Sequence, residues 1–226
     1  MAIARDATSN GVGSAITSLT VSHTSTGSDL IILSSILTLP GTDIVTGVTH
    51  DANAETRINT INNDGGANGS QRKYLYYRIA PGTGAKNVVT STSESATILD
   101  ANVTYTGAQQ SAQPDANNTS FQTSGTARSV VVTTVADNCV VVCGFRRNAG
   151  DNGAAGAGTT QIQDDGADGG ALYESDPLAV TPAGAKTINV TISVGATDSL
   201  ACAASIVPAA AAVTTESNHM ALLGVG

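Results

Sequence analysis

Large aromatic side chains are scarce in this chain of 226 residues: tryptophan is absent, and two phenylalanines and five tyrosines make up only 3% of the sequence. Hydrophobic residues nevertheless reach 41%, which is enough apolar material for a core. That core has to be built from valine, isoleucine, leucine and alanine, and the β-branched members of this group suit the pleated surface of a sheet. The composition therefore favours closely packed β-structure.

Charge is also scarce, because charged residues make up 12% of the chain, against about 25% in typical globular proteins. The net charge is −8 and the isoelectric point is about 4.6. Phosphate binding needs clustered lysine and arginine, so we expect no nucleic-acid partner. The exposed surface must consist largely of serine, threonine, asparagine and glycine, a texture common in extracellular and virion proteins.

No apolar run is long enough to span a bilayer, so we expect no membrane partner. Residues 1–10 contain no apolar stretch of signal-peptide length. We therefore expect synthesis in a host cytoplasm without a classical export signal. An extracellular-looking surface without such a signal is what a protein assembled into a virion would have.

Only three cysteines are present. Cys139 and Cys143 lie on one face of a predicted strand, about 13 Å apart when extended, too far to form a disulfide with each other. Either could pair with Cys202 if their strands are neighbours, whereas buried free thiols are expected of a protein that folds in a reducing cytosol. No Cys-x-x-Cys motif or nearby histidine completes a ligand set, so we expect no metal and no cofactor.

Short strand-like runs separated by Gly, Asn, Asp, Ser and Pro follow one another from residue 10 onward, and no amphipathic helix of any length interrupts them. Residues 30–39 are the most apolar run and predict a central strand that is buried on both faces at its start. Residues 127–135 and 139–145 predict a hairpin. Other strands are predicted at residues 19–23, 44–50, 57–61, 98–105, 171–174, 186–194 and 199–207.

This pattern predicts an all-β fold, an antiparallel β-sandwich of jelly-roll type that forms a single domain over residues 1–208. Residues 108–118 and 146–170 are predicted to be loops, the second of which projects from one end. Residues 209–226 fall outside the strand rhythm. They are either a segment that docks on a neighbour or a frayed terminus.

The most distinctive strand covers residues 72–79, which hold three of the five tyrosines. Alternation places Leu75, Tyr77 and Ile79 on a core face. The opposite face is a stripe formed by Arg72, Tyr74, Tyr76 and Arg78. A Pro-Gly turn follows, and residues 86–93 are predicted to return as the second strand of a hairpin.

Three interpretations of this stripe remain open. Tyrosine and arginine are enriched at interface hot spots, which favours contact with another subunit. Tyrosine rings also stack on sugars, which favours a carbohydrate-binding or host-adhesion module. Alternatively, both faces of the strand are buried and only the arginines emerge at its ends.

Eight segments, which together span residues 15–208, carry a family resemblance: 18–23, 28–33, 45–49, 74–77 with 80–82, 88–90, 105–107, 130–142 and 203–208. In this order they resemble a recurrent jelly-roll-like β-sandwich family of phage virion proteins and bacterial surface proteins. The resemblance implies a β-sandwich displayed on a particle or surface, and it implies no catalytic residues. Residues 146–170 and the C-terminal tail lie outside it.

Catalytic and metal-binding signals are weak. His23 and His50 are predicted at strand ends, far from any Ser-Gly elbow, so we expect no enzymatic activity and no catalytic residues. Asp164, Asp165 and Asp168 offer oxygen ligands for Ca²⁺ but lack the spacing of an EF-hand loop. We therefore expect a solvated loop tip there, or ion pairs with Arg146 and Arg147.

Together these features predict a non-enzymatic structural protein of a virion. It would serve as a capsid decoration or cement protein, or in a tail or fibre head. Its expected partners are copies of itself and other virion proteins, with a host glycan as the alternative.

Overall fold

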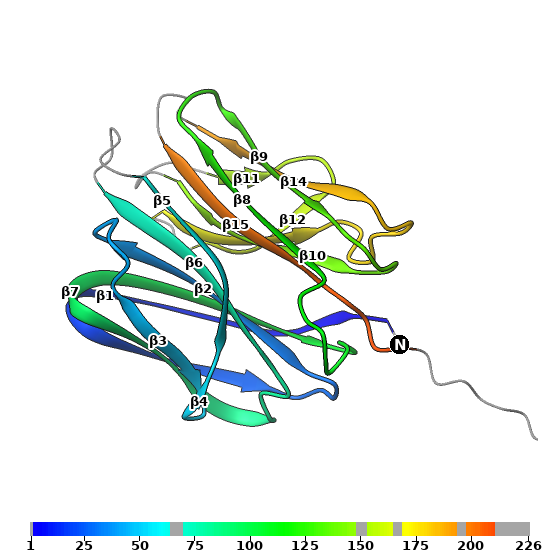
Figure 1. Cartoon of the computed structure of the whole chain (residues 1–226), viewed down its shortest axis with the longest axis horizontal. Helices are drawn as coiled ribbons and strands as arrows, with labels where there is room; N and C mark the ends of the chain where they lie inside the picture. Colours follow the sequence, from blue (N-terminus) through cyan, green and yellow to red (C-terminus); the bar gives the residue numbers. More distant parts are fainter. Residues whose placement is uncertain (1, 64–69, 148–152, 165–168, 194–197, 211–226) are drawn as a thin grey trace, which may run out of the picture.

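The structure is a computed structural model that describes residues 2–63, 70–147, 153–164, 169–193 and 198–210. The regular elements of these residues are strands, and they form three antiparallel sheets (Figure 1). The predicted all-β, sandwich-like architecture is therefore confirmed. The described part of the chain contains no helix with the length and apolarity needed to cross a bilayer.

The strands divide into sheets of seven, five and three. The seven-stranded sheet contains β1 (Ala4–Ser25), β2 (Ile31–Leu39), β3 (Val45–His50), β4 (Asn53–Ala54), β5 (Thr56–Asn63), β6 (Gln71–Ile79) and β7 (Gly84–Thr106). The five-stranded sheet contains β12 (Thr159–Asp164), β13 (Gly170–Ser175), β10 (Val140–Arg146), β15 (Ser199–Ile206) and β8 (Ala116–Gln122). The three-stranded sheet contains β11 (Gly153–Ala155), β14 (Ala185–Ile192) and β9 (Ala127–Thr133).

The seven-stranded sheet folds back over itself because its two longest strands are bent. β1 and β7 pair along nearly their whole length, with irregularities between Gly13 and Ser18 where the ribbon turns. We call the part formed by β5, β6, β2 and residues 98–106 and 4–13 the inner leaf. The part formed by β4, β3 and residues 84–91 and 18–25 is the outer leaf.

The two halves of β1 meet where the leaves close. A Cβ atom at Gly11 would lie only 2.7 Å from Val21 Cγ2, so this position needs glycine for the halves to approach. Asp6 adds a polar contact, because its carboxylate accepts a hydrogen bond from the Thr26 amide at 2.9 Å.

The result is a stack of four layers: outer leaf, inner leaf, five-stranded sheet and three-stranded sheet (Figure 1). One apolar cluster lies between each pair of neighbouring layers. The two middle layers are covered on both faces, so β10, β13 and β15 are buried along their whole length and β2 along all but its last residue. The prediction that residues 30–39 form a central strand is confirmed.

The hairpin predicted between residues 72–79 and 86–93 is wrong. β2 lies between β6 and β7 and pairs with both, so the turn at residues 80–83 crosses over a strand. The Pro-Gly signal marked the turn correctly, but a turn does not determine which strands become neighbours. Residues 86–93 and 98–105, predicted as separate strands, belong to the single bent strand β7.

The hairpin predicted between residues 127–135 and 139–145 is also wrong. β9 pairs with β14 in the three-stranded sheet, whereas β10 pairs with β13 and β15 in the five-stranded sheet. β9 alternates between buried and exposed residues, as an outer strand does, while β10 is buried throughout. The short connection therefore passes from one layer to the next.

Several elements were missed. β1 begins at Ala4, before the first predicted strand, and β8 begins inside the predicted loop at residues 108–118. The region 146–170 contains β11 and β12 rather than a continuous loop. Of the C-terminal tail, only Ala209 and Ala210 are described, and the Ala209 amide donates to Gly107 O at 2.8 Å.

Candidate functional site

The predicted stripe on β6 lies inside the stack rather than on its surface. Tyr74 is fully buried and Tyr76 is 5% exposed, while Arg72 and Arg78 are half-buried. The alternation itself was predicted correctly, since Tyr74 and Tyr76 face the outer leaf and Leu75 faces the five-stranded sheet. Of the three interpretations left open, the burial of both tyrosines agrees with the one in which both faces of the strand are covered and only the arginines emerge.

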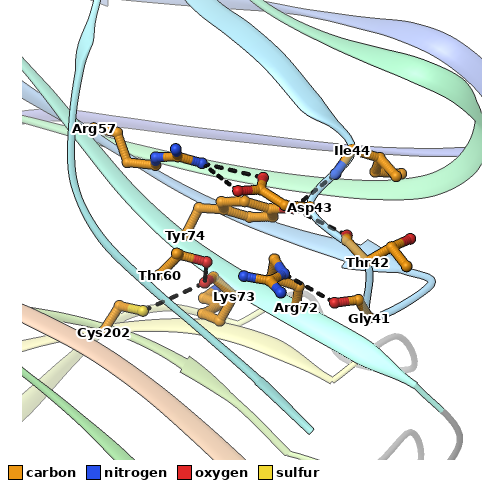
Figure 2. Close-up of polar contacts among 10 residues, drawn as sticks. All are labelled: Gly41, Thr42, Asp43, Ile44, Arg57, Thr60, Arg72, Lys73, Tyr74 and Cys202. Carbon is orange, nitrogen blue, oxygen red and sulfur yellow. Dashed lines mark hydrogen bonds and ion pairs between the residues drawn. The ribbon is translucent and has the colours of Figure 1, made fainter. Parts of the chain in front are cut away.

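The stripe holds the connection between β2 and β3 against β6 (Figure 2). The Tyr74 hydroxyl accepts a hydrogen bond from the Ile44 amide at 3.3 Å and donates one to Thr42 O at 3.4 Å. Arg72 Nε donates to Gly41 O at 2.8 Å. Through these hydrogen bonds, Arg72 and Tyr74 fix the position of the connection between β2 and β3.

Burial also makes the tyrosines unsuitable as sugar platforms. Desolvation raises the pKa of Tyr76 to about 12, against opposing effects that include the nearby Arg57 guanidinium. Figure 2 shows Arg57 paired with Asp43 close to the Tyr74 ring, with Nη1–Oδ distances of 2.9 and 3.1 Å. The burial of both rings removes the observation on which the glycan-binding hypothesis depended. Contact with a partner stays a prediction for Arg72 and Arg78.

A larger set of polar side chains lies deeper between the two leaves. These residues come from β1, β2, β3, β6, β7 and the turn after β4, and most have less than a tenth of their surface exposed. We call them the interleaf polar cluster: His23, Ser34, His50, Glu55, Arg78, Thr90, Asp100, Asn102 and Thr104.

Carboxylates in this cluster bond across the leaves. Thr90 Oγ1, in the outer leaf, donates to Asp100 Oδ2 in the inner leaf at 2.9 Å. Ser34 Oγ, in the inner leaf, donates to Glu55 Oε1 at 3.0 Å. Desolvation, with a smaller contribution from Asp100, raises the pKa of Glu55 to about 8. Glu55 is therefore mostly protonated at neutral pH.

The two histidines extend the cluster. His23 Nδ1 shares a hydrogen bond of 2.8 Å with Ser9 Oγ, and its Nε2 bonds to Thr104 Oγ1. The His50 ring lies 6.3 Å from the His23 ring, edge to face, and Arg78 Nη1 donates to His50 O at 2.7 Å.

Both imidazoles are held neutral. Burial, followed by the proximity of His50, lowers the pKa of His23 to about 4, although Asp6 acts in the opposite direction. Burial and the charge of Arg78 lower the pKa of His50. At neutral pH neither ring therefore carries a charge, and the neutral His23 ring joins the outer leaf to the inner leaf through Ser9 and Thr104.

The Ser9–His23 pair differs from a catalytic triad. A triad needs a carboxylate on the second imidazole nitrogen to orient the ring and stabilise its protonated form. In this structure that nitrogen bonds to the hydroxyl of Thr104. The contacts of His23 instead tie the end of β1 to β7 and to the first half of β1. The absence of enzymatic activity stays a prediction.

Sequence reasoning missed this cluster, although one signal was visible. Residues 98–105 alternate between an apolar set and a set that includes Asp100, Asn102 and Thr104. Such alternation is typical of a strand with one solvent-facing side. Here the outer leaf covers that side, and the sequence contains no local sign of this cover.

The three cysteines are free and buried, as expected. Cys143 faces the three-stranded sheet and Cys202 faces the inner leaf, so the two thiols point to opposite sides of the same sheet. Burial raises the pKa of Cys143 to about 12 and raises that of Cys202 well above the usual range of a thiol, which suppresses thiolate chemistry.

The acidic loop is only partly described. Asp164 forms an ion pair with the buried Arg147, as one of the expectations proposed. Asp165 and Asp168 lie outside the described residues, so whether Asp164, Asp165 and Asp168 bind Ca²⁺ is not tested by the structure. In the described part of the chain, no group of three or more His, Cys, Asp or Glu side chains is arranged to hold a metal ion.

Comparison with known proteins gives no relative: no family model, no curated protein and no solved structure matches this chain.

Proposed function

We propose that this chain is a non-enzymatic structural protein of a phage-like particle, serving as capsid decoration or cement, or in a tail or fibre head. The observation that supports this most is the four-layer stack, in which two middle layers are covered on both faces. The jelly-roll assignment and the virion setting belong to this proposal and come from the sequence resemblance.

The polar groups of the interior support the same role, because they join layers. Thr90 and Asp100 join the outer leaf to the inner leaf. Glu174 accepts hydrogen bonds from Tyr105 and Arg5, which joins the inner leaf to the five-stranded sheet. Buried polar links of this kind favour one rigid arrangement of the layers. A rigid body that keeps its shape suits permanent display on a particle.

The proposal is tested on particles. Antibodies raised against the purified chain would be used for immunogold labelling of particles purified from lysates of the source, alongside mass spectrometry of the same fractions. We expect regular labelling and a fixed number of copies per particle. A chain that stays in the soluble fraction as a stable monomer, and is missing from every particle fraction, would contradict the proposal.

A further inference from the structure

The outer face of the three-stranded sheet is a surface of mostly small, uncharged side chains. β9 alternates so that Val130 and Val132 point into the core, and the residues between them point outward. β14 does the same around Ile188 and Val190. The outward positions, in register across β9, β14 and β11, are Ala127, Ser129, Val131, Thr133, Ala185, Thr187, Asn189, Thr191 and Ala154.

This face carries no ionisable side chain among those described positions, although the chain has a net charge of −8. Two copies of an acidic protein repel each other wherever acidic surfaces meet. Contact through a neutral face avoids placing like charges against each other. A cationic partner, by contrast, would gain nothing from binding this surface.

Apolar area distinguishes this face from the opposite end of the stack. Val131 is 41% exposed, and Val135, just beyond β9, is 75% exposed. Both surfaces carry hydroxyls, but the outward β1 positions of the outer leaf, Ser18, Thr20, Ser22 and Thr24, include no exposed valine. Removing valine from water is favourable, whereas burying a hydroxyl costs free energy unless it finds a partner.

The free edge of β9 is closed to another strand. Asn118 Nδ2 donates to Val131 O at 2.8 Å, and Gln122 Oε1 accepts from the Ser129 amide at 2.9 Å. The amide of Val135 is bonded to Asp115 Oδ2 at 2.9 Å. Side chains thus occupy backbone groups that an added strand would need. Association at this sheet is therefore directed to its face.

We propose that the outer face of the three-stranded sheet binds the same face of a second copy of this chain, forming a two-fold symmetric pair. A two-fold axis lets one patch serve both partners. Sheet-on-sheet contact repeats the packing that already joins the layers within the chain. Three strands about 4.8 Å apart and seven residues of about 3.3 Å each give roughly 300 Å² per copy.

Two such faces bury roughly 600 Å², which is well below the 1,200 Å² or so of stable interfaces. The pair is consequently weak in dilute solution and forms where copies are concentrated. The proposed function supplies such a setting, and in that respect this inference depends on it.

Sedimentation equilibrium and light scattering between about 10 μM and about 1 mM test the proposal, a range chosen to include weak association. For the wild type we expect a weight-average mass that rises toward twice the monomer mass. Val131→Lys places a like charge from each copy at the contact, and we expect its dissociation constant to increase at least about tenfold. Thr187→Lys, on the neighbouring strand, tests the same face should Val131→Lys fold poorly.

Thr20→Lys is the matched control, because it adds the same charge at an outward position on the opposite end of the stack. It should associate as the wild type does. A wild type that stays monomeric throughout the series overturns the proposal, as does a loss of association in Thr20→Lys equal to that in the face variants. Neither result affects the labelling of particles, so the two proposals fail separately.

Discussion

Glu55 and His23 lie in the same buried interface, but their contributions to the stability of the fold depend on pH in opposite directions. The pKa of Glu55 rises from 4.5 to about 8 on folding, so the folded state holds a proton that the unfolded state releases. Its contribution to stability is complete below pH 4.5 and is lost as the pH rises through 8. This difference between the folded and unfolded pKa of Glu55 corresponds to at most about 5 kcal/mol of unfolding free energy.

We expect Glu55→Gln to stabilise the chain at pH 8–9 by about 2–4 kcal/mol. Glutamine keeps an oxygen that accepts from Ser34 and cannot ionise. Urea unfolding at pH 5, 7 and 9 measures this, with Glu94→Gln, at an exposed glutamate, as the matched control. Parallel pH profiles for wild type and Glu55→Gln would rule out the assigned role.

The pKa of His23 falls from 6.5 to about 4 on folding, so its contribution to stability changes with pH in the direction opposite to that of Glu55. The unfolded state binds the proton first, and stability is complete above pH 6.5 and lost as the pH falls toward 4. The loss amounts to about 3 kcal/mol. We expect the imidazole of His23, followed by NMR, to titrate near pH 4, and His23→Gln to lose less stability between pH 7.5 and 4.5 than wild type does. Titration near pH 6.5 would contradict this expectation.

At the scale of elements, the approach of β10 to β2 depends on one glycine. A Cβ atom at Gly144 would lie 2.9 Å from Ser35 Cβ and 3.0 Å from Lys73 Cε. Two strands buried on both faces have no free side to which they can yield. The close approach explains why glycine stands in the middle of an otherwise continuous apolar strand.

We expect Gly144→Ala to destabilise the chain by about 1–3 kcal/mol through overpacking. Ser35→Gly in the same chain removes the facing Cβ and should recover part of that loss. A double-mutant cycle from chemical unfolding measures the coupling between the two positions. If the effects of the two substitutions on the unfolding free energy simply add, positions 144 and 35 are not coupled, and the contact between them does not limit how closely the two sheets approach.

At the scale of the whole molecule, Glu174, on β13 of the five-stranded sheet, links that sheet to the inner leaf. Its Oε2 accepts from the Tyr105 hydroxyl at 2.7 Å, and its Oε1 pairs with Arg5 Nη1 at 2.9 Å. The carboxylate is almost fully buried, and burial raises its pKa. Because Tyr105 is fully buried, loss of Glu174 leaves its hydroxyl without this acceptor.

We expect Glu174→Ala to cost about 2–4 kcal/mol of unfolding free energy. Asp43→Ala is the contrasting control, because it breaks an exposed pair with Arg57 and should cost less than about 1 kcal/mol. Thermal and urea unfolding of the two variants measure the difference. Equal losses would show that the link through Glu174 contributes no more than a surface ion pair.

The sequence by itself determined the fold class and the faces of single strands. Alternation placed Leu75 and Tyr74 on opposite faces of β6, and the apolar run of β2 indicated a strand buried on both sides. Both features follow from the local geometry of an extended chain, in which side chains alternate. Turn residues likewise marked where strands end.

Only the tertiary structure decided which strands are neighbours and which faces are covered. The turn before β7 is the same whether the chain pairs with β6 or crosses β2, and the polar face of Asp100, Asn102 and Thr104 looks solvent-exposed until the outer leaf folds over it. The outer leaf closes over the inner leaf because β1 and β7 bend together, and the paired residues of these two strands lie up to about a hundred positions apart. Contacts of such range leave no periodic trace in the sequence, so the buried position of the tyrosines became visible only in the assembled stack.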